Sequence, residues 1–327
     1  MQVNRTIYFL PSYIERAPSS RVRVYCIARS LYGFDESVKV LPHNWSHDQK
    51  HCILESVKAQ DIIYVQKWRT AFNSVEHLSE YKGKCKLVFD MDDATGDPQA
   101  LQLIDLCDAL VVGNHFLYDQ HKDKKTTFLV PSPVDLKEYP QWKGESKERQ
   151  ISIAKCGIKP MLKPMFALMP ILRSIQETHP FTLLLAGFND DVQQQEVEKN
   201  IKFSKCLPLE KYDDYLRRTV PLLQQTQLSI LPFIARDDGK SGHSLLANMA
   251  MGVPTIASSY AECEHIIKQG ENGFIARNNE EWKNYIEQLF NDIGLRKRIR
   301  DNAWETIRST YDVPVIARLL LSYLNQI

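Results

Sequence analysis

The sequence has no long apolar run, no close pair of cysteines and almost no net charge, and each absence excludes a class of protein. No apolar stretch approaches the roughly 18 residues that a membrane-spanning helix needs. The seven cysteines are scattered, odd in number and without a CxxC pair, which argues against a zinc site or a disulfide framework. With 41 basic and 40 acidic residues, the formal net charge is +1 and gives no electrostatic reason to expect a nucleic-acid partner.

The composition that remains is that of an ordinary soluble protein, 43% apolar and 25% charged. A length of 327 residues suggests two domains. Near the start of the chain, Arg5 is followed by only a short strand-like run, so we expect no secretory signal. We therefore expect a cytoplasmic protein with reduced core thiols, whose modestly basic first helix allows peripheral contact with the inner face of a membrane.

Short apolar stretches alternate with helical ones along both halves of the chain. In the first half, strands are expected at residues 6–10, 38–41, 61–66, 86–93, 109–112 and 127–130. Their continuous apolar character indicates a parallel sheet covered on both faces, so the expected fold class is α/β. A proline-rich and then charged segment places a domain boundary near residues 140–150. In the second half, strands are expected at residues 151–154, 181–185, 201–203, 228–233 and 253–257, before a last helix with an apolar stripe at Ile316, Leu320, Tyr323 and Ile327.

A small polar loop at residues 239–244 lies between a predicted strand and a predicted helix. The first N–H groups of a helix have no partner within it, and its dipole favours an anion there. The loop adds the charge of Lys240 and the hydroxyls of Ser241 and Ser244, and Gly242 and His243 complete it. We interpret it as a candidate anion site; the alternative is that Ser241 or Ser244 merely caps the helix.

A second candidate anion site follows the first predicted strand, where Ser20, Arg21 and Arg23 begin a helix. Arginines in a first turn oppose the helix dipole, so they need another reason to be present. An anionic ligand is one such reason, and a solvated basic face is the alternative.

Three carboxylates, Asp90, Asp92 and Asp93, stand at the end of the strand expected at 86–93. In parallel sheets, ligands bind beyond the carboxyl ends of the strands, which favours contact between these side chains and a substrate. Asp90 and Asp92 would share one face of the strand, so a metal site is an alternative, as is a polar strand end without chemistry.

Three histidines, His43, His47 and His51, are spaced four residues apart. A helix would present them on one face, but Pro42 and the polar surroundings favour a solvated loop. No HExxH-type spacing occurs among the nine histidines, so we expect no metal site.

Two motifs in the second half, "MAMGVPTIAS" and "ENGF", resemble the C-terminal domain of GT-B retaining glycosyltransferases of the group 1 type. In the first half, "SSRVRVYCIARSL", "LVFDMDD", "CDALVVGN" and "VPSPVDLKEYP" are similar to N-terminal-domain motifs, in the correct order. The resemblance implies a GT-B fold of two Rossmann-like, doubly wound domains with an interdomain cleft. The implied domains are an acceptor-side domain at 1–145, a nucleotide-sugar-binding domain at 146–308 and a C-terminal helix at 309–327 that packs back toward the first domain.

The resemblance also implies a function, transfer of a sugar from a nucleotide-sugar donor to a glycan or lipid-linked glycan acceptor with retention of configuration, as in polysaccharide biosynthesis. The nucleotide-sugar is a co-substrate, and neither a cofactor nor a metal is expected.

The family's motifs imply the site residues position by position. Lys163 falls on the family's phosphate-binding lysine, while Ile158 falls on its arginine, with Lys159 beside it as a stand-in. Gly187 matches a glycine that the nucleotide approaches, and the 239–244 loop wraps the donor phosphates and sugar. Lys163 and Lys240 would then stabilise the leaving phosphate. Asp92 takes the place of a histidine near the reacting centre.

The chain departs from the family at two positions. Family members usually carry two glutamates eight residues apart on this loop and helix, where this chain has Gly239 and Ala247. We interpret the chain as a divergent member that replaces carboxylate contacts with Lys, Ser and His contacts to phosphate. Two alternatives stay open, namely a non-catalytic GT-B-like binding subunit and a nucleotide-sugar epimerase of the same fold.

Overall fold

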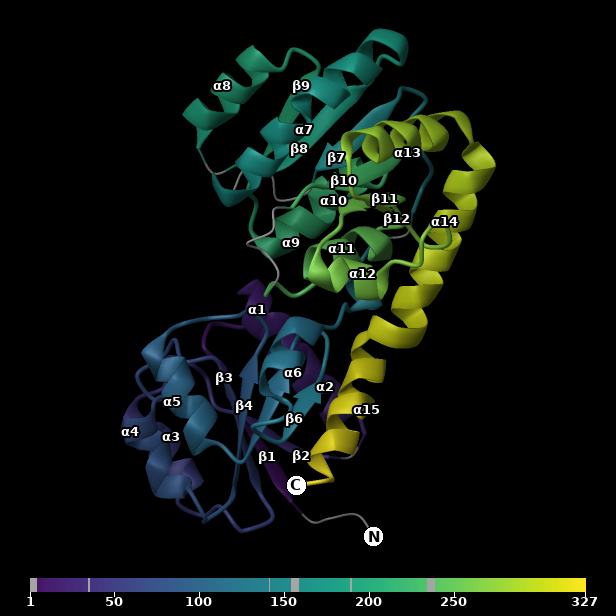
Figure 1. Ribbon diagram of the computed structural model, residues 1–327. Helices are drawn as coiled ribbons and strands as arrows, with labels where there is room; N and C mark the ends of the chain where they lie inside the picture. Colours follow the sequence, from purple (N-terminus) through teal and green to yellow (C-terminus); the bar gives the residue numbers. More distant parts are fainter. Residues whose placement is uncertain (1–4, 35, 141, 154–158, 189, 234–238) are drawn as a thin grey trace. The chain divides into compact units, whose positions relative to one another are not determined.

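The computed structural model describes residues 5–327 except 35, 141, 154–158, 189 and 234–238 (Figure 1). Its contacts divide the chain into two units. The first comprises Met1–Asp135, Gly239–Ser241 and Thr310–Ile327, and the second comprises Leu136–Asp238 and Gly242–Ser309. Over the described part of the chain, no helix combines the length and apolarity that a membrane crossing requires.

The first unit is built on a parallel six-stranded sheet with the order β2-β1-β3-β4-β5-β6. Its strands are β1 (Thr6–Leu10), β2 (Ser37–Val40), β3 (Ile62–Gln66), β4 (Lys86–Met91), β5 (Ala109–Val112) and β6 (Thr127–Leu129). Its helices are α1 (Pro18–Ser20), η1 (Arg21–Tyr25), α2 (Cys26–Tyr32), α3 (His47–Leu54), α4 (Val75–Leu78), η2 (Ser79–Tyr81), α5 (Pro98–Leu106), α6 (His115–His121) and α15 (Val313–Leu324). The strand order reverses between β1 and β3, which is where ligands bind in open α/β sheets.

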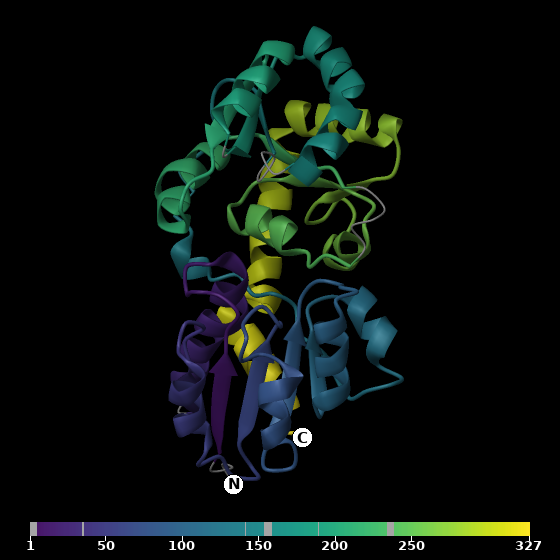
Figure 2. The same ribbon diagram turned by 90° about the vertical axis from the view of Figure 1, so that its left-hand side faces the viewer.

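Helices cover both faces of this sheet, as Figure 2 shows. Successive residues of a strand point to opposite faces. On β1, Ile7 and Phe9 enter the core formed with α2 and α15, while Tyr8 and Leu10 enter the core on the side of α3, α5 and α6. This double coverage explains why the strands are apolar throughout.

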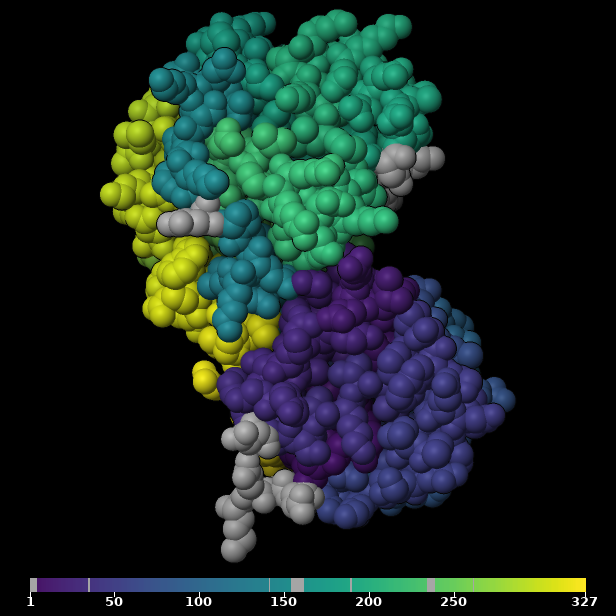
Figure 3. Space-filling model, turned by 180° about the vertical axis from the view of Figure 1, so that it is seen from behind, coloured from purple at the N-terminus to yellow at the C-terminus, as the bar shows by residue number. Residues whose placement is uncertain are grey.

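The last helix, α15, packs on α2 within the first unit. Ile316, Leu320 and Leu324 are buried in the same core as Ile27 and Leu31, which confirms the predicted apolar stripe. The Tyr323 ring adds to this contact by stacking on Phe128, with 4.7 Å between the ring centroids. In Figure 3 this yellow C-terminal segment lies against the purple N-terminal one.

The second unit also has a parallel six-stranded sheet, ordered β12-β11-β10-β7-β8-β9. Its strands are β7 (Gln150–Ile153), β8 (Thr182–Phe188), β9 (Ser204–Pro208), β10 (Leu228–Leu231), β11 (Thr255–Ser258) and β12 (Phe274–Ala276). Its helical segments are η3 (Leu136–Glu138), α7 (Lys159–Thr178), α8 (Asp191–Asn200), α9 (Tyr212–Asp214), η4 (Tyr215–Thr219), α10 (Val220–Leu223), α11 (His243–Ala250), α12 (Ala261–Ile266), α13 (Asn279–Asn291) and α14 (Ile293–Thr306), and η6 (Ile307–Tyr311) follows α14. Counted from β7, the order is 3-2-1-4-5-6, the order of doubly wound dinucleotide-binding sheets, and its reversal lies between β7 and β10.

Three sequence-based expectations about local structure are wrong. The strand expected at 201–203 is β9 (Ser204–Pro208), because the Ile201 N–H still bonds to the Val197 carbonyl at the end of α8. From the sequence, residues 155–164 are expected to form a loop before an apolar helix at 165–175. Residues 155–158 lie outside the described residues, and α7 already begins at Lys159 and includes Pro164. The loop expected to carry the spaced histidines becomes helical at His47, where Ser46 and Gln49 form a capping box.

Candidate functional site

Two helices begin beyond the switch point of the second sheet. The chain leaves β7 toward α7 and leaves β10 toward α11, so both helix N-termini follow adjacent strands at the point where the strand order reverses. Lys163 lies on α7, and the predicted phosphate loop leads into α11. Topology therefore puts the two sets of predicted phosphate contacts after neighbouring strands.

Among the residues that the structure describes, the start of α11 has no side-chain cap. The N-cap residue of α11 is Gly242, which has no side chain to accept a hydrogen bond from the first turn. Neither Ser241 nor Ser244 is therefore the N-cap residue. The N–H groups of the first turn keep the capacity to bind an anion. Lys240 is exposed, and Ser241, His243 and Ser244 are partly exposed.

Gly242 lets α11 begin close to α12. A β-carbon at this position would lie 2.4 Å from Ile266 Cδ1 and 3.0 Å from Glu262 Cγ, too close without rearrangement. Glu262 is buried, with 2% of its surface exposed, and was not among the residues singled out from sequence. It lies on α12, beyond the end of the "MAMGVPTIAS" motif, and only the packing identifies it.

Lys163 is the fifth residue of α7, and its side chain is exposed. Its charge is available to an anion bound at the start of α7, whose first turn contains no acidic residue. Lys159 is the first residue of α7, and Ile158 lies outside the described residues.

Gly187 has a local structural reason to be glycine. Its φ is +99°, and the pairing of β8 with β9 is irregular between Ala186 and Phe188. A side chain at this φ would be strained, so the glycine permits the bulge whether or not a nucleotide approaches it.

Arg23 and Asp90 form a buried ion pair in the first unit, with 0% and 1% of their side-chain surfaces exposed. Arg23 Nε donates to Asp90 Oδ2 at 3.2 Å, and Nη1 donates to the Val130 carbonyl. The anionic partner that the arginine needs is thus the protein's own carboxylate. Because neither side chain presents surface to a ligand, their placement corrects the expectation of substrate contact and gives the pair a structural role.

Lys67 and Asp92 form a second pair, at the carboxyl ends of β3 and β4. Lys67 Nζ lies 2.6 Å from Asp92 Oδ1 and 3.6 Å from Asp93 Oδ2, with 13%, 9% and 42% of the three side chains exposed. Ser19 Oγ donates to Asp92 Oδ2 at 3.3 Å. Protein cations therefore already balance both Asp90 and Asp92, which argues against the metal alternative for this strand end.

Lys67 is a further candidate residue that the sequence analysis did not single out. Its φ of +55° is uncommon for a residue with a side chain, and such conformations cluster at functional sites. The Asn73 side chain holds this turn by donating to the carbonyls of Leu10, Gln66 and Lys67. The signal available from the sequence was its place directly after the apolar strand expected at 61–66.

Burial and neighbouring charges have opposite effects on the pKa values of Lys67 and Asp92. Burial alone would raise the pKa of Asp92, but the Lys67 ammonium and then the Arg23 guanidinium outweigh it and hold that pKa below its ordinary value. Burial would lower the pKa of Lys67, and the Asp92 carboxylate reverses this and raises it. Both groups are therefore charged at neutral pH.

Ser20 belongs to a buried network rather than to an open surface. Its hydroxyl donates to Gln66 Oε1 at 2.7 Å and accepts from the Tyr13 N–H at 3.0 Å. Gln66 also donates to Ser19 Oγ at 2.9 Å. This network ties the loop after β1 to the end of β3, and Arg21 follows it, half-buried.

The turn after β5 packs against the backbone of Asp92 and hydrogen-bonds to it. A β-carbon on Gly113 would lie 2.8 Å from Asp92 Cα, so glycine permits this approach. Asn114 caps α6 through its oxygen and donates to the Asp92 carbonyl at 3.0 Å. It also donates to the carbonyl of Gly239, a residue that groups with the first unit and accepts from the Ala94 N–H.

The predicted site residues therefore form separate groups. The first unit brings together Ser20, Arg23, Asp90, Asp92 and Asp93 around Gln66 and Lys67. In the second unit, Gly242, His243 and Ser244 lie at α11, Lys163 on α7 and Gly187 on β8.

Replacing Lys67 with alanine is expected to lower the free energy of unfolding by about 3 kcal/mol at neutral pH, because the Asp92 carboxylate loses its cation. The folded-state pKa of Asp92 lies below its ordinary value, so this stabilisation is present above the unfolded pKa and is lost as the pH falls through the folded one. In denaturant titrations, the difference in the free energy of unfolding between wild type and Lys67→Ala should become smaller below about pH 4. Lys67→Arg, which keeps the charge, is the control, and a difference that does not change with pH would contradict the assignment.

Comparison with known proteins bears on both units. Residues 162–292 match the family model described as glycosyl transferases group 1. A comparison with curated proteins found no match.

Solved structures share the fold along the whole chain. A glycosyltransferase from Rickettsia africae is 12% identical with a TM-score of 0.74, covering 100% of this chain and 99% of its own. Sucrose-phosphate synthase from Thermosynechococcus elongatus is 12% identical with a TM-score of 0.69, covering 98% of each chain. Anabaena HepE in complex with UDP is 12% identical with a TM-score of 0.65, covering 99% of this chain and 100% of its own. The chain therefore has the GT-B fold of glycosyltransferase structures, two parallel six-stranded sheets with flanking helices.

Proposed function

We propose that the protein is a glycosyltransferase that moves a sugar from a nucleotide-sugar donor to a glycan or lipid-linked glycan acceptor, with retention. The observation that carries the proposal is the family match over residues 162–292, which includes α11 and nearly all of α7. The fold adds support, because Anabaena HepE has this fold and binds UDP, and a second structure of it holds UDP and glucose.

The donor phosphates are assigned to the switch point of the second sheet. In sugar transfer the leaving group is a nucleoside diphosphate, so negative charge grows on it in the transition state. In the second unit, Lys163 and the start of α11 supply positive charge and N–H donors for that charge. Lys240, which groups with the first unit, is proposed as a further phosphate contact from its place in the sequence shortly before α11. The hydroxyls of Ser241 and Ser244 and the His243 ring are the proposed neighbouring contacts, and neither a cofactor nor a metal takes part.

The first unit is assigned to the sugar and acceptor. Asp92 and Asp93, held by Lys67 at the carboxyl ends of β3 and β4, are the proposed contacts to hydroxyl groups. Arg23, Asp90 and Ser20 act by positioning, since they are buried beneath this edge. We place the reaction in the cytoplasm, at the inner face of a membrane when the acceptor is lipid-linked.

Nucleotide binding tests the proposal through thermal stability. We expect one of UDP, GDP, ADP, CMP and dTDP to stabilise the full chain, by about 2.7 kcal/mol at 100 times its dissociation constant. Lys163→Ala and Lys240→Ala should abolish most of this stabilisation. Lys283→Ala, an exposed lysine on α13, is the matched control and should respond as wild type does.

A non-catalytic binding subunit is the second candidate, because the resemblance to group 1 glycosyltransferases implies glutamates at the positions of Gly239 and Ala247. It predicts nucleotide binding without turnover of any nucleotide-sugar. Failure of every nucleotide to stabilise the chain would contradict both candidates, whereas an equal response from Lys163→Ala would contradict only the placement of the phosphates.

A further inference from the structure

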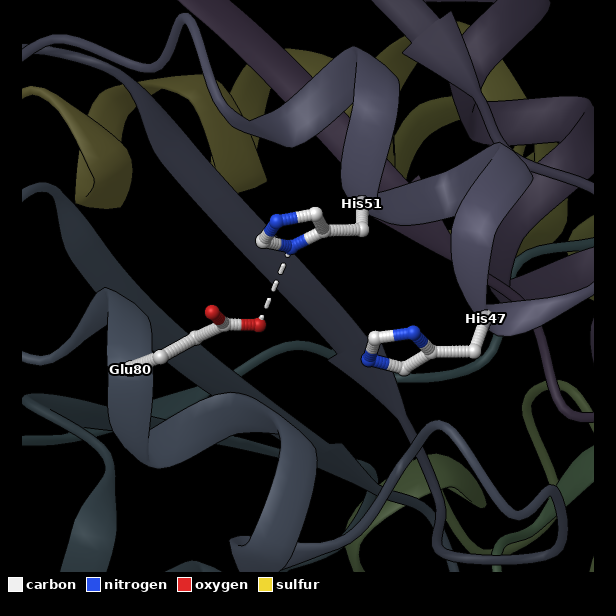
Figure 4. Close-up of side chains that lie close together, drawn as sticks. All are labelled: His47, His51 and Glu80. Carbon is white, nitrogen blue, oxygen red and sulfur yellow. Dashed lines mark ion pairs between the residues drawn. The ribbon is translucent and has the colours of Figure 1, made fainter.

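Two histidines and a glutamate come together on the first unit, on elements that carry none of the residues assigned to the substrate (Figure 4). His47 and His51 lie one turn apart on α3, and Glu80 comes from η2. A ligand atom from each of the three can be chosen so that all lie within 4.8 Å of one another. Neither the proposed transfer reaction nor the family match uses them.

The helix fixes the two imidazoles on one face. Side chains at i and i+4 lie above one another on an α-helix, and the two rings are nearly parallel, with 5.6 Å between centroids and 13° between planes. The capping box at Ser46 and Gln49 holds the start of this helix, where His47 is the first residue. The pair is therefore presented by regular structure.

The contact between Glu80 and His51 is an ion pair whose spacing is also compatible with a shared metal ion. His51 Nδ1 lies 3.2 Å from Glu80 Oε1. Two ligands bound tetrahedrally to Zn²⁺ at about 2.0–2.2 Å are about 3.4 Å apart. His47, with 44% of its side chain exposed, offers a ring nitrogen within 4.8 Å of a ligand atom on each of His51 and Glu80.

The surroundings supply further oxygen and imidazole groups. His51 Nε2 lies 3.4 Å from Glu55 Oε1, and His51 Nδ1 lies 2.9 Å from the Tyr81 hydroxyl. The His77 ring centroid is 4.7 Å from that of His47. Carboxylates beside a metal-bound imidazole orient it and strengthen its binding, so Glu55 fits a supporting position.

We propose that His47, His51 and Glu80 bind one divalent first-row transition-metal ion, with Zn²⁺ as the representative, and that the ion joins α3 to η2. Imidazole and carboxylate are the ligands that such ions take in proteins, and two histidines with one glutamate form a recurring zinc set. The ion would stabilise the segment between Lys67, which follows β3, and η2. Three protein ligands leave the fourth tetrahedral position to water, and the site is separate from the residues assigned to sugar transfer.

Calorimetric titration of Zn²⁺ into the chelator-treated full chain tests this proposal. We expect one ion per chain, bound with micromolar or tighter affinity. His47→Ala, His51→Ala and Glu80→Gln should each weaken binding at least about tenfold, the scale of losing a ligand or its support. Circular dichroism of each variant confirms folding, and Glu80→Gln, which keeps the side-chain shape, is the decisive variant if a histidine variant misfolds.

Two controls separate this site from adventitious binding. His121→Ala removes a partly exposed histidine at the end of α6, and Cys52→Ser removes the exposed thiol beside His51. Both should bind Zn²⁺ as wild type does. Absence of binding in the wild type, equal loss in His121→Ala, or loss only in Cys52→Ser would each overturn the proposal. Nucleotide binding serves as an independent readout that should be retained in all five variants.

Discussion

Replacing Arg23 with methionine is expected to lower the free energy of unfolding by about 3–5 kcal/mol. The substitution keeps an apolar stem of similar length but leaves the Asp90 carboxylate, 1% exposed, without its cation. Burial raises the pKa of Asp90, and the Arg23 guanidinium works against that effect, so removing Arg23 raises this pKa further. Scanning calorimetry of the full chain should show the loss in the transition of the first unit.

The double variant Arg23→Met with Asp90→Asn is the control for this result. It removes both charges and should recover part of the lost stability, because the unpaired buried charge is the main cost. A loss below about 1 kcal/mol in the single variant, the range of an exposed pair, would contradict the assignment. No recovery in the double variant would show that packing by the arginine stem, and not charge, is responsible.

Replacing Lys163 with alanine is expected to lower kcat for sugar transfer by about 10²–10³-fold, the effect of removing one donor aimed at transition-state charge. The lysine is exposed and packs little, so the folded state should be unchanged. Steady-state kinetics with the nucleotide-sugar whose nucleotide stabilises the chain would measure the effect.

Lys283→Ala again provides the matched control, since it removes one exposed lysine from a helix outside the switch point. It should leave kcat within about twofold of wild type, as expected for a surface change. If Lys163→Ala raises KM at constant kcat, the lysine binds donor and transition state equally and is not catalytic in the proposed sense.

The sequence predicted the architecture well, because the strands are buried on both faces and so are continuously apolar. Residues 6–10 are the first strand as predicted, and residues 109–112 are another. Strand order was not predictable from these patterns, since it depends on contacts between distant segments. Local propensity also misplaced the start of α7, because Pro164, expected at the end of a loop, lies inside the helix.

The candidate site was predicted less completely. The anomaly of an arginine at a helix start was visible in the sequence, but its partner Asp90 lies 67 residues away and only the fold identifies it. Lys67 belongs to no recognisable sequence motif. Its left-handed backbone conformation is held by hydrogen bonds from the Asn73 side chain, which depend on the fold. The four-residue spacing of the histidines is compatible with a helix, but their polar surroundings favoured a loop. The structure is helical from His47 onward.

Release of nucleoside diphosphate from nucleotide-sugars tests the central claim most directly. Water can serve as a slow acceptor, so the assay works whatever the identity of the glycan. The proposal predicts that the purified chain releases the nucleotide that stabilises it from the corresponding nucleotide-sugar, and that Lys163→Ala does so far more slowly. The contradictory result is a wild-type chain that binds the nucleotide but releases it from the nucleotide-sugar no faster than Lys163→Ala, with water or with glycan acceptors. That result would contradict sugar transfer and favour a binding subunit.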